Sequence, residues 1–66
     1  MATLGEEYPK EQARCRKLLR IYKDLGPVGA FGYAAISDVI ARADRAAVEG
    51  DLPAMIRCFE EMRKCK

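Results

Sequence analysis

Residues 49–53 read EGDLP, and this stretch decides how the second half of the chain folds. Gly50 suits the left-handed position just past a helix end, and Asp51 can cap the next helix by accepting a hydrogen bond from an exposed backbone N–H. Pro53 fits the first turn of that helix, where its missing N–H costs nothing. Because the link is so short, the helices on either side of it are expected to form an antiparallel hairpin.

Apolar residues recur at spacings of three and four on both sides of this turn, which is typical of helices with one buried face. The pattern predicts helices over residues 30–49 and 52–65. Alanine is frequent on the first of them and lets a neighbouring helix come close. The apolar positions before the turn are Ile36, Val39, Ile40, Ala43, Ala46 and Ala47. Those after it are Leu52, Met55, Ile56, Phe59 and Met62.

The same periodicity marks an earlier helix, predicted over residues 9–25. Pro9 suits its first turn, Gly26 suits the residue after its end, and Pro27 cannot continue it. Residues 1–8 have no period and are expected to be a flexible N-terminal segment, followed by a single helical domain over residues 9–66. The sequence thus predicts an all-α, small three-helix bundle. The apolar positions of the first helix are Cys15, Leu18, Leu19, Tyr22 and Leu25.

Size and composition limit the possible functions. A chain of 66 residues buries a small core, so self-association into a homo-oligomer is expected to stabilise it. Three scattered cysteines without any histidine do not form a zinc site, so neither a metal nor another cofactor is expected. With no secretion signal, the cysteines are expected to stay reduced in a cytoplasm, Cys15 and Cys58 as small buried residues. No apolar run is long enough to cross a membrane.

Catalytic residue combinations are not apparent. The chain has no histidine, and no serine or cysteine has a plausible base beside it. The carboxylates fall where solvated helix faces place them, with Asp38–Arg42 and Arg57–Glu61 at the spacing of ordinary surface pairs. We therefore expect that the protein is not an enzyme.

Residues 26–33, GPVGAFGY, are the first candidate binding site. Glycine-rich turns before a helix can hold phosphates on free backbone N–H groups, but this one lacks the Lys-Ser or Lys-Thr ending of a Walker loop. A purely structural alternative has Gly26 end a helix and Phe31 pack into the core. Three glycines exceed the needs of a turn, which suggests close approach of a ligand, a second subunit or the third helix. The candidate residues are Gly26, Gly29, Phe31, Gly32 and Tyr33.

Basic residues concentrated in the first helix are the second candidate site. Residues 10–24 carry six basic and two acidic side chains, while the whole chain has a net charge of only +2. Such a strip can bind phosphates of nucleic acids. The simpler interpretation, a solvated face of an amphipathic helix, is favoured. The candidate residues are Arg14, Lys17, Arg20 and Lys23.

The stretches YPKEQARCRKLLRIYKDLGPVGAFGYAAI (8–36) and ADRAAVEGDLPAMIRCFEEM (43–62) resemble a family of short accessory proteins encoded by bacteriophages and prophages. A YPKEQ start, a GPxGAFG loop and a Gly-Asp turn recur in that family. The resemblance implies a bacterial cytoplasm and a role based on binding.

We expect one of three binding functions. The favoured function is inhibition of a host defence system through a protein–protein interaction. The first alternative is a sponge for a phosphorylated or cyclic nucleotide, with its phosphates on the loop N–H groups and on Arg20 or Lys23, and its base on Phe31 or Tyr33. The second alternative is nucleic-acid binding through the first helix.

Overall fold

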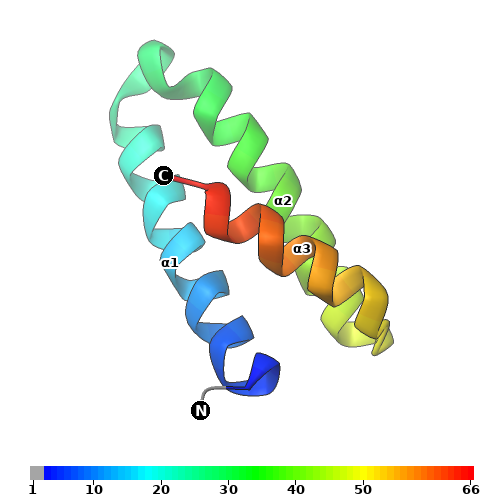
Figure 1. The fold of residues 1–66 in the computed structure, drawn as a ribbon. Coiled ribbons are helices and arrows are strands. Elements are labelled where there is room, and N and C mark those ends of the chain that lie inside the picture. The colour runs from blue at the N-terminus through cyan, green and yellow to red at the C-terminus, as the bar shows by residue number, and fades with distance from the viewer. Residues whose placement is uncertain (1–2) are drawn as a thin grey trace.

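The computed structural model describes residues 3–66, which form an all-α bundle of three helices. Helix α1 (Leu4–Asp24) leads through a short 3-10 helix, η1 (Gly26–Gly29), into α2 (Ala30–Glu49), and α3 (Leu52–Lys64) follows. Figure 1 shows α1 and α2 meeting at the η1 corner and diverging from there, with α3 returning from the end of α2 towards the middle of α1. The predicted fold class is confirmed, including the antiparallel hairpin of α2 and α3.

The turn between α2 and α3 has the predicted local structure. Gly50 adopts a left-handed conformation with φ 66°, and its N–H donates to carbonyl groups in the last turn of α2. The Asp51 side chain accepts a hydrogen bond from the Ala54 N–H at 3.2 Å, so it caps α3 as expected. The predicted bounds of α2 are confirmed, and α3 ends one residue earlier than predicted.

The start of α1 differs from the prediction. The helix begins at Leu4 and not near residue 9, so residues 4–8 are helical where a flexible segment was expected. Thr3 is the reason: its Oγ1 accepts a hydrogen bond from the Glu6 N–H at 3.2 Å, as in the capping box Ser/Thr-x-x-Glu. Pro9 therefore lies inside the helix and not at its first turn. Residues 1–2 of the predicted segment lie outside the described residues.

The core lies where α3 crosses the space between α1 and α2. Tyr8 belongs to it: the side chain is buried, its ring stacks on Phe59, and its hydroxyl donates to the Ala43 carbonyl oxygen at 2.7 Å. Cys15 and Cys58 are buried as predicted. The small side chain of Ala43, fully buried, gives α1 and α3 room to approach α2. The buried side chains are Tyr8, Cys15, Ile36, Ile40, Ala43, Ala46, Cys58 and Met62.

Within residues 3–66, none of the helices combines the length and the apolar character that a membrane crossing requires.

Candidate functional site

The three glycines of the corner region are explained by the fold itself: Gly26 by its backbone conformation, and Gly29 and Gly32 by the packing of α1 against α2. Gly26 adopts the left-handed conformation, with φ 68°, that the end of α1 requires. A Cβ at Gly29 would overlap the carbonyl oxygen of Tyr22, and a Cβ at Gly32 would lie 2.6 Å from Cε1 of the Tyr22 ring. The close neighbour is therefore the end of α1 of the same chain, and not the ligand, second subunit or third helix that the sequence suggested. No ligand is needed to explain these glycines.

The start of α2 has no side-chain cap, in line with its sequence. The 3-10 turn supplies backbone acceptors instead, since the Ala30 N–H donates to the Pro27 carbonyl oxygen. Gly29 itself is buried. These features leave the turn less suited to hold a phosphate than an open glycine-rich loop would be.

Phe31 lies outside the core, so the structural alternative for this residue is wrong. Its side chain is 87% exposed, and that of Val28 is 88% exposed. Ile21 and Leu25, near the end of α1, are also more than half exposed. We call these four residues of the corner region, Ile21, Leu25, Val28 and Phe31, the apical patch. Exposed apolar side chains that gather in one region of a fold mark interaction surfaces in many proteins.

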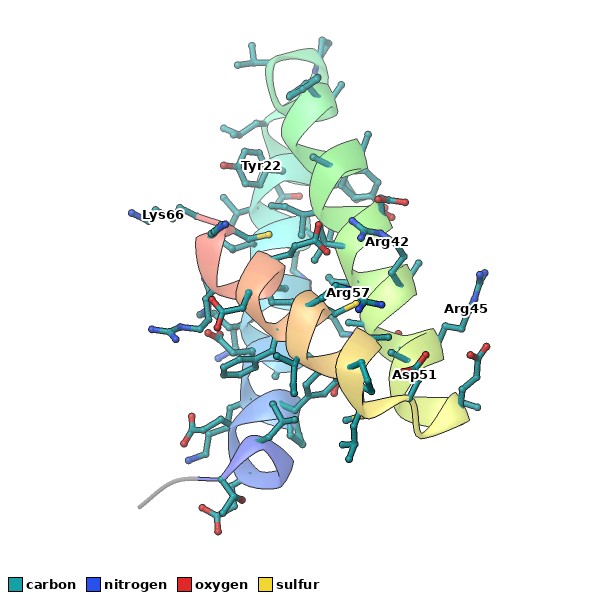
Figure 2. All side chains as sticks on the ribbon, turned by 45° about the vertical axis from the view of Figure 1, so that its right-hand side comes forward. Tyr22, Arg42, Arg45, Asp51, Arg57 and Lys66 are labelled. Atoms are coloured by element: carbon teal, nitrogen blue, oxygen red, sulfur yellow. The ribbon has the colours of Figure 1, made fainter. Side chains whose placement is uncertain are left out.

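A shallow hollow of about 450 Å³ lies beside the corner. It brings together residues from both predicted candidate sites, because Lys23 of the basic set and Tyr33 of the loop set line it with Tyr22. The Tyr22 hydroxyl donates to the Lys66 carbonyl oxygen, which fixes the ring at the edge of the hollow (Figure 2). We call this feature the apical hollow; the rest of its lining is Gly26, Pro27 and Ala30.

The predicted basic residues do not act as one surface. Arg14 is bound to its own protein: the guanidinium pairs with Glu11 and donates to the carbonyl oxygens of Met62 and Cys65, the latter at 2.8 Å. Met62 belongs to the last turn of α3 and Cys65 follows its last residue, so the cation also complements the helix dipole. Within residues 3–66, the salt bridges of the basic α1 side chains involve Lys10, Arg14 and Arg16, and not Lys17, Arg20 or Lys23.

Replacing Arg14 by methionine should therefore lower the free energy of unfolding by about 1–2 kcal/mol, because the α3 carbonyls lose a charged donor. Arg20→Met is the matched control, since Arg20 is exposed and should change stability by less than about 0.5 kcal/mol. Urea unfolding followed by circular dichroism measures both. Equal, small effects would mean that Arg14 does not cap α3.

A groove of about 570 Å³ between α2 and α3 was not predicted from the sequence. Arg42 and Arg45 line it from α2, and Arg57 lines it from α3. In Figure 2, Arg42 and Arg57 lie between the two helices, while Arg45 extends away from α3. The available signal was positional: Arg45 and Arg57 lie six residues before and six residues after Asp51, so an antiparallel hairpin brings them to the same level.

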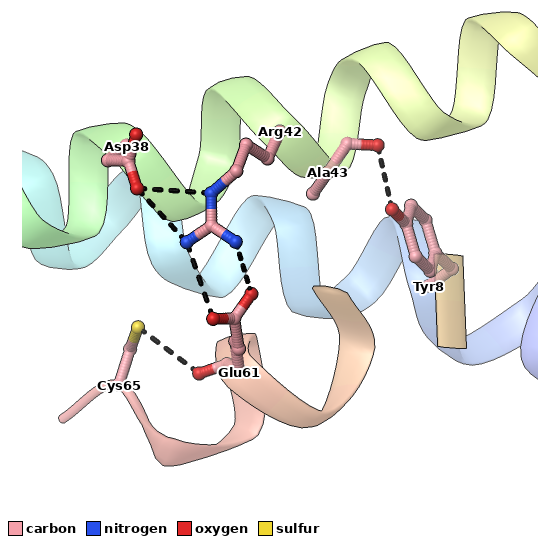
Figure 3. Close-up of polar contacts among 6 residues, drawn as sticks. All are labelled: Tyr8, Asp38, Arg42, Ala43, Glu61 and Cys65. Atoms are coloured by element: carbon pink, nitrogen blue, oxygen red, sulfur yellow. Dashed lines mark hydrogen bonds and ion pairs between the residues drawn. The ribbon is translucent and has the colours of Figure 1, made fainter. Parts of the chain in front are cut away.

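Arg42 is neutralised by two carboxylates in this groove. Its guanidinium pairs with Asp38 at 3.0 Å, as predicted, and with Glu61 of α3 at 2.7 Å (Figure 3). Glu61 therefore pairs across the hairpin, whereas the sequence suggested Arg57 as its partner. This network joins α2 to α3 and leaves one negative charge in excess at that point of the groove.

The thiol of Cys15 is kept neutral by its surroundings. Burial raises the pKa of Cys15 from 9.0 to about 11, and the neighbouring Cys65 adds to this effect. A group with a raised pKa in the native state favours that state below its unfolded pKa and loses this contribution as the pH rises towards the native pKa. The stability contributed by the neutral thiol is thus present below about pH 9 and lost near pH 11.

The stability difference between the wild type and Cys15→Ala should consequently shrink by about 2–3 kcal/mol between pH 8.5 and pH 11. The subtraction removes the titration of other groups, such as Tyr8, whose pKa is also raised by burial. Urea unfolding at a series of pH values measures the difference. A constant difference would show that Cys15 ionises normally in the folded protein.

Metal-binding clusters are not found: in the part of the chain that the structure describes, no three histidine, cysteine or carboxylate side chains come together in a suitable way. No protein-family model, curated protein or solved structure matches the chain. The resemblance to phage accessory proteins consequently stays a prediction.

Proposed function

We propose that the chain is a non-enzymatic binding protein that holds a protein partner on the apical patch. The observation that supports this most is the exposure of Val28 and Phe31, at 88% and 87%, beside a corner whose glycines are explained by backbone conformation and internal packing. An aromatic and a branched apolar side chain that stay in water do not stabilise the isolated fold. In interfaces, such side chains are effective anchors.

The charges next to the patch suggest the chemistry of the partner. Arg20 precedes the patch residue Ile21 in sequence, and Lys23 lies between Ile21 and Leu25. Both are exposed, as is the single carboxylate of this stretch, Asp24. A fitting partner would offer an apolar pocket with carboxylates at its rim, because opposite charges at an interface rim speed association and orient the two proteins. The resemblance to phage accessory proteins supports a host protein in a bacterial cytoplasm as this partner, and inhibition of a host defence system as the outcome.

A nucleotide sponge is the second candidate, favoured by the apical hollow. Lys23 could pair with a phosphate there, and Tyr22 or Tyr33 could stack on a base. Nucleic-acid binding through α1 is less well supported, since Arg14 is occupied by Glu11 and by the end of α3. Self-association, expected from the small size of the core, is a separate prediction that does not involve the apical patch.

The test compares capture of host proteins by three immobilised forms: the wild type, the double variant Val28→Ser/Phe31→Ser, and Val48→Ser. Val48 is a matched control, because it is equally exposed but lies at the other end of α2. A captured protein is purified, and its dissociation constant is measured with each form. We expect the double variant to bind at least about tenfold more weakly, and Val48→Ser to bind like the wild type.

Two parallel measurements separate the other ligands. Light scattering gives the mass of each form, and a dimer that only the double variant loses would make a second copy the occupant of the patch. A thermal-shift screen against cyclic and linear nucleotides tests the sponge, because a ligand that binds only the folded state raises the melting temperature. Three results would overturn the proposal of a protein partner on the patch: a dimer that only the double variant loses, a nucleotide that raises the melting temperature, or equal partner binding by all three forms.

A further inference from the structure

Two of the three cysteines meet where the end of α3 lies against α1. Cys15 Sγ lies 3.6 Å from the Met62 carbonyl oxygen, and the Cys65 N–H donates to the same oxygen at 3.1 Å. Two cysteines that lie 50 positions apart in sequence thus contact the same carbonyl oxygen in the fold.

Their surroundings differ in a way that suits a stepwise reaction. Cys15 is fully buried, whereas Cys65 is half-buried and follows the last residue of α3, where a reagent can reach it. Figure 3 shows the Cys65 thiol directed back to the Glu61 carbonyl oxygen, 3.5 Å away. Because Cys65 lies beyond the helix end, its backbone can adjust to bring the two sulfur atoms to bonding distance without disturbing the helix.

Cys58 occupies a separate environment. It is buried on the side of α3 that faces the α2–α3 groove, with Arg42 and Glu61 among its charged neighbours. Its thiol is therefore not part of the Cys15–Cys65 pair, and it serves as an internal control.

We propose that Cys15 and Cys65 form a reversible disulfide, under a peroxide oxidant, that fastens the end of α3 to α1. In the first step, the Cys65 thiolate attacks one peroxide oxygen and breaks the O–O bond, giving a sulfenic acid and hydroxide, which takes up the proton that the thiol released and becomes water. In the second step, the Cys15 thiolate attacks the sulfenic sulfur and displaces hydroxide, which leaves as water after taking up a proton. Overall, two thiols are oxidised and one hydrogen peroxide is reduced to two molecules of water.

The bond would close a loop of about 50 residues, which restricts the unfolded chain strongly. The oxidised protein should therefore melt about 10 °C or more above the reduced protein. Dithiothreitol should return the lower melting temperature. Because the buried Cys15 must ionise to attack, the second step should accelerate about tenfold per pH unit between pH 7 and pH 9.

The experiment treats the reduced chain with hydrogen peroxide and follows the intact mass, the melting temperature and the linked peptides. We expect a loss of about 2 Da, a bond mapped to Cys15 and Cys65, and the higher melting temperature. Cys58→Ser should behave in the same way. Cys65→Ser should lose both the mass change and the stabilisation, and its own melting temperature before treatment reports whether it is folded.

Three results would overturn the inference. The first is a stable sulfinic acid on Cys65, with a gain of about 32 Da, because it would mean that Cys15 does not reach the sulfenic acid. The second is a bond that includes Cys58. The third is a disulfide between two chains and not within one, which the intact mass distinguishes directly.

Discussion

Replacing Gly29 by alanine should unfold the protein or lower its free energy of unfolding by about 3–5 kcal/mol, a large part of the stability of so small a domain. The added Cβ would overlap the Tyr22 carbonyl oxygen, which is a backbone atom and already accepts the Leu25 N–H at 3.2 Å. Relief of the overlap would require α1 and α2 to separate at the corner. Urea unfolding followed by far-UV circular dichroism measures the loss.

Two other glycines provide controls for this substitution. A Cβ at Gly26 meets open space, so Gly26→Ala should cost only about 1–2 kcal/mol for its left-handed backbone. Gly5→Ala lies in the first turn of α1, where the nearest atom would be 3.9 Å away, and should stabilise the protein by about 0.5–1 kcal/mol. If Gly29→Ala costs no more than Gly26→Ala, the close packing of the corner on Tyr22 is wrong.

Replacing Tyr8 by alanine should lower the free energy of unfolding by about 3–5 kcal/mol. The side chain is 2% exposed, and its ring stacks on Phe59 with 6.4 Å between the ring centres. Its loss would leave a cavity between α1 and α3 and would detach the first turns of α1. Thermal and urea unfolding measure the effect.

Tyr8→Phe separates the ring from the hydroxyl group. It keeps the stacking on Phe59 and removes only the 2.7 Å hydrogen bond to the Ala43 carbonyl oxygen, so it should cost about 1 kcal/mol. A loss below about 1 kcal/mol for Tyr8→Ala would contradict the structure. It would favour the flexible N-terminal segment that the sequence predicted.

Local signals account for the parts of the fold that the sequence predicted well. Gly50, Asp51 and Pro53 act within a few residues of themselves, so they determine the turn and the neighbouring helix ends whatever the rest of the chain does. At the start of α1 two local signals compete. Pro9 pointed to a later start, but the Thr3 side-chain cap prevails because Tyr8 gains a buried position when the helix extends.

The candidate sites depended on contacts that periodicity does not reveal. The role of Gly29 comes from Tyr22, and the role of Arg14 comes from the last turn of α3, 48 and 51 residues further along the chain. One interpretation of the sequence placed Phe31 in the core, but its side chain is 87% exposed. For these residues, only the packing of α1 against α2 and α3 shows which side chains hold the fold together and which are free to bind a partner.

The central claim is that Val28 and Phe31 contribute nothing to the fold and are left for a partner. The most direct test is the free energy of unfolding of Phe31→Ser, measured beside the control Val48→Ser. The structure predicts that both substitutions change stability by less than about 0.5 kcal/mol, as at ordinary exposed positions. A loss of about 3 kcal/mol for Phe31→Ser alone would mean that Phe31 is a core residue, and it would contradict the apical patch as a binding surface.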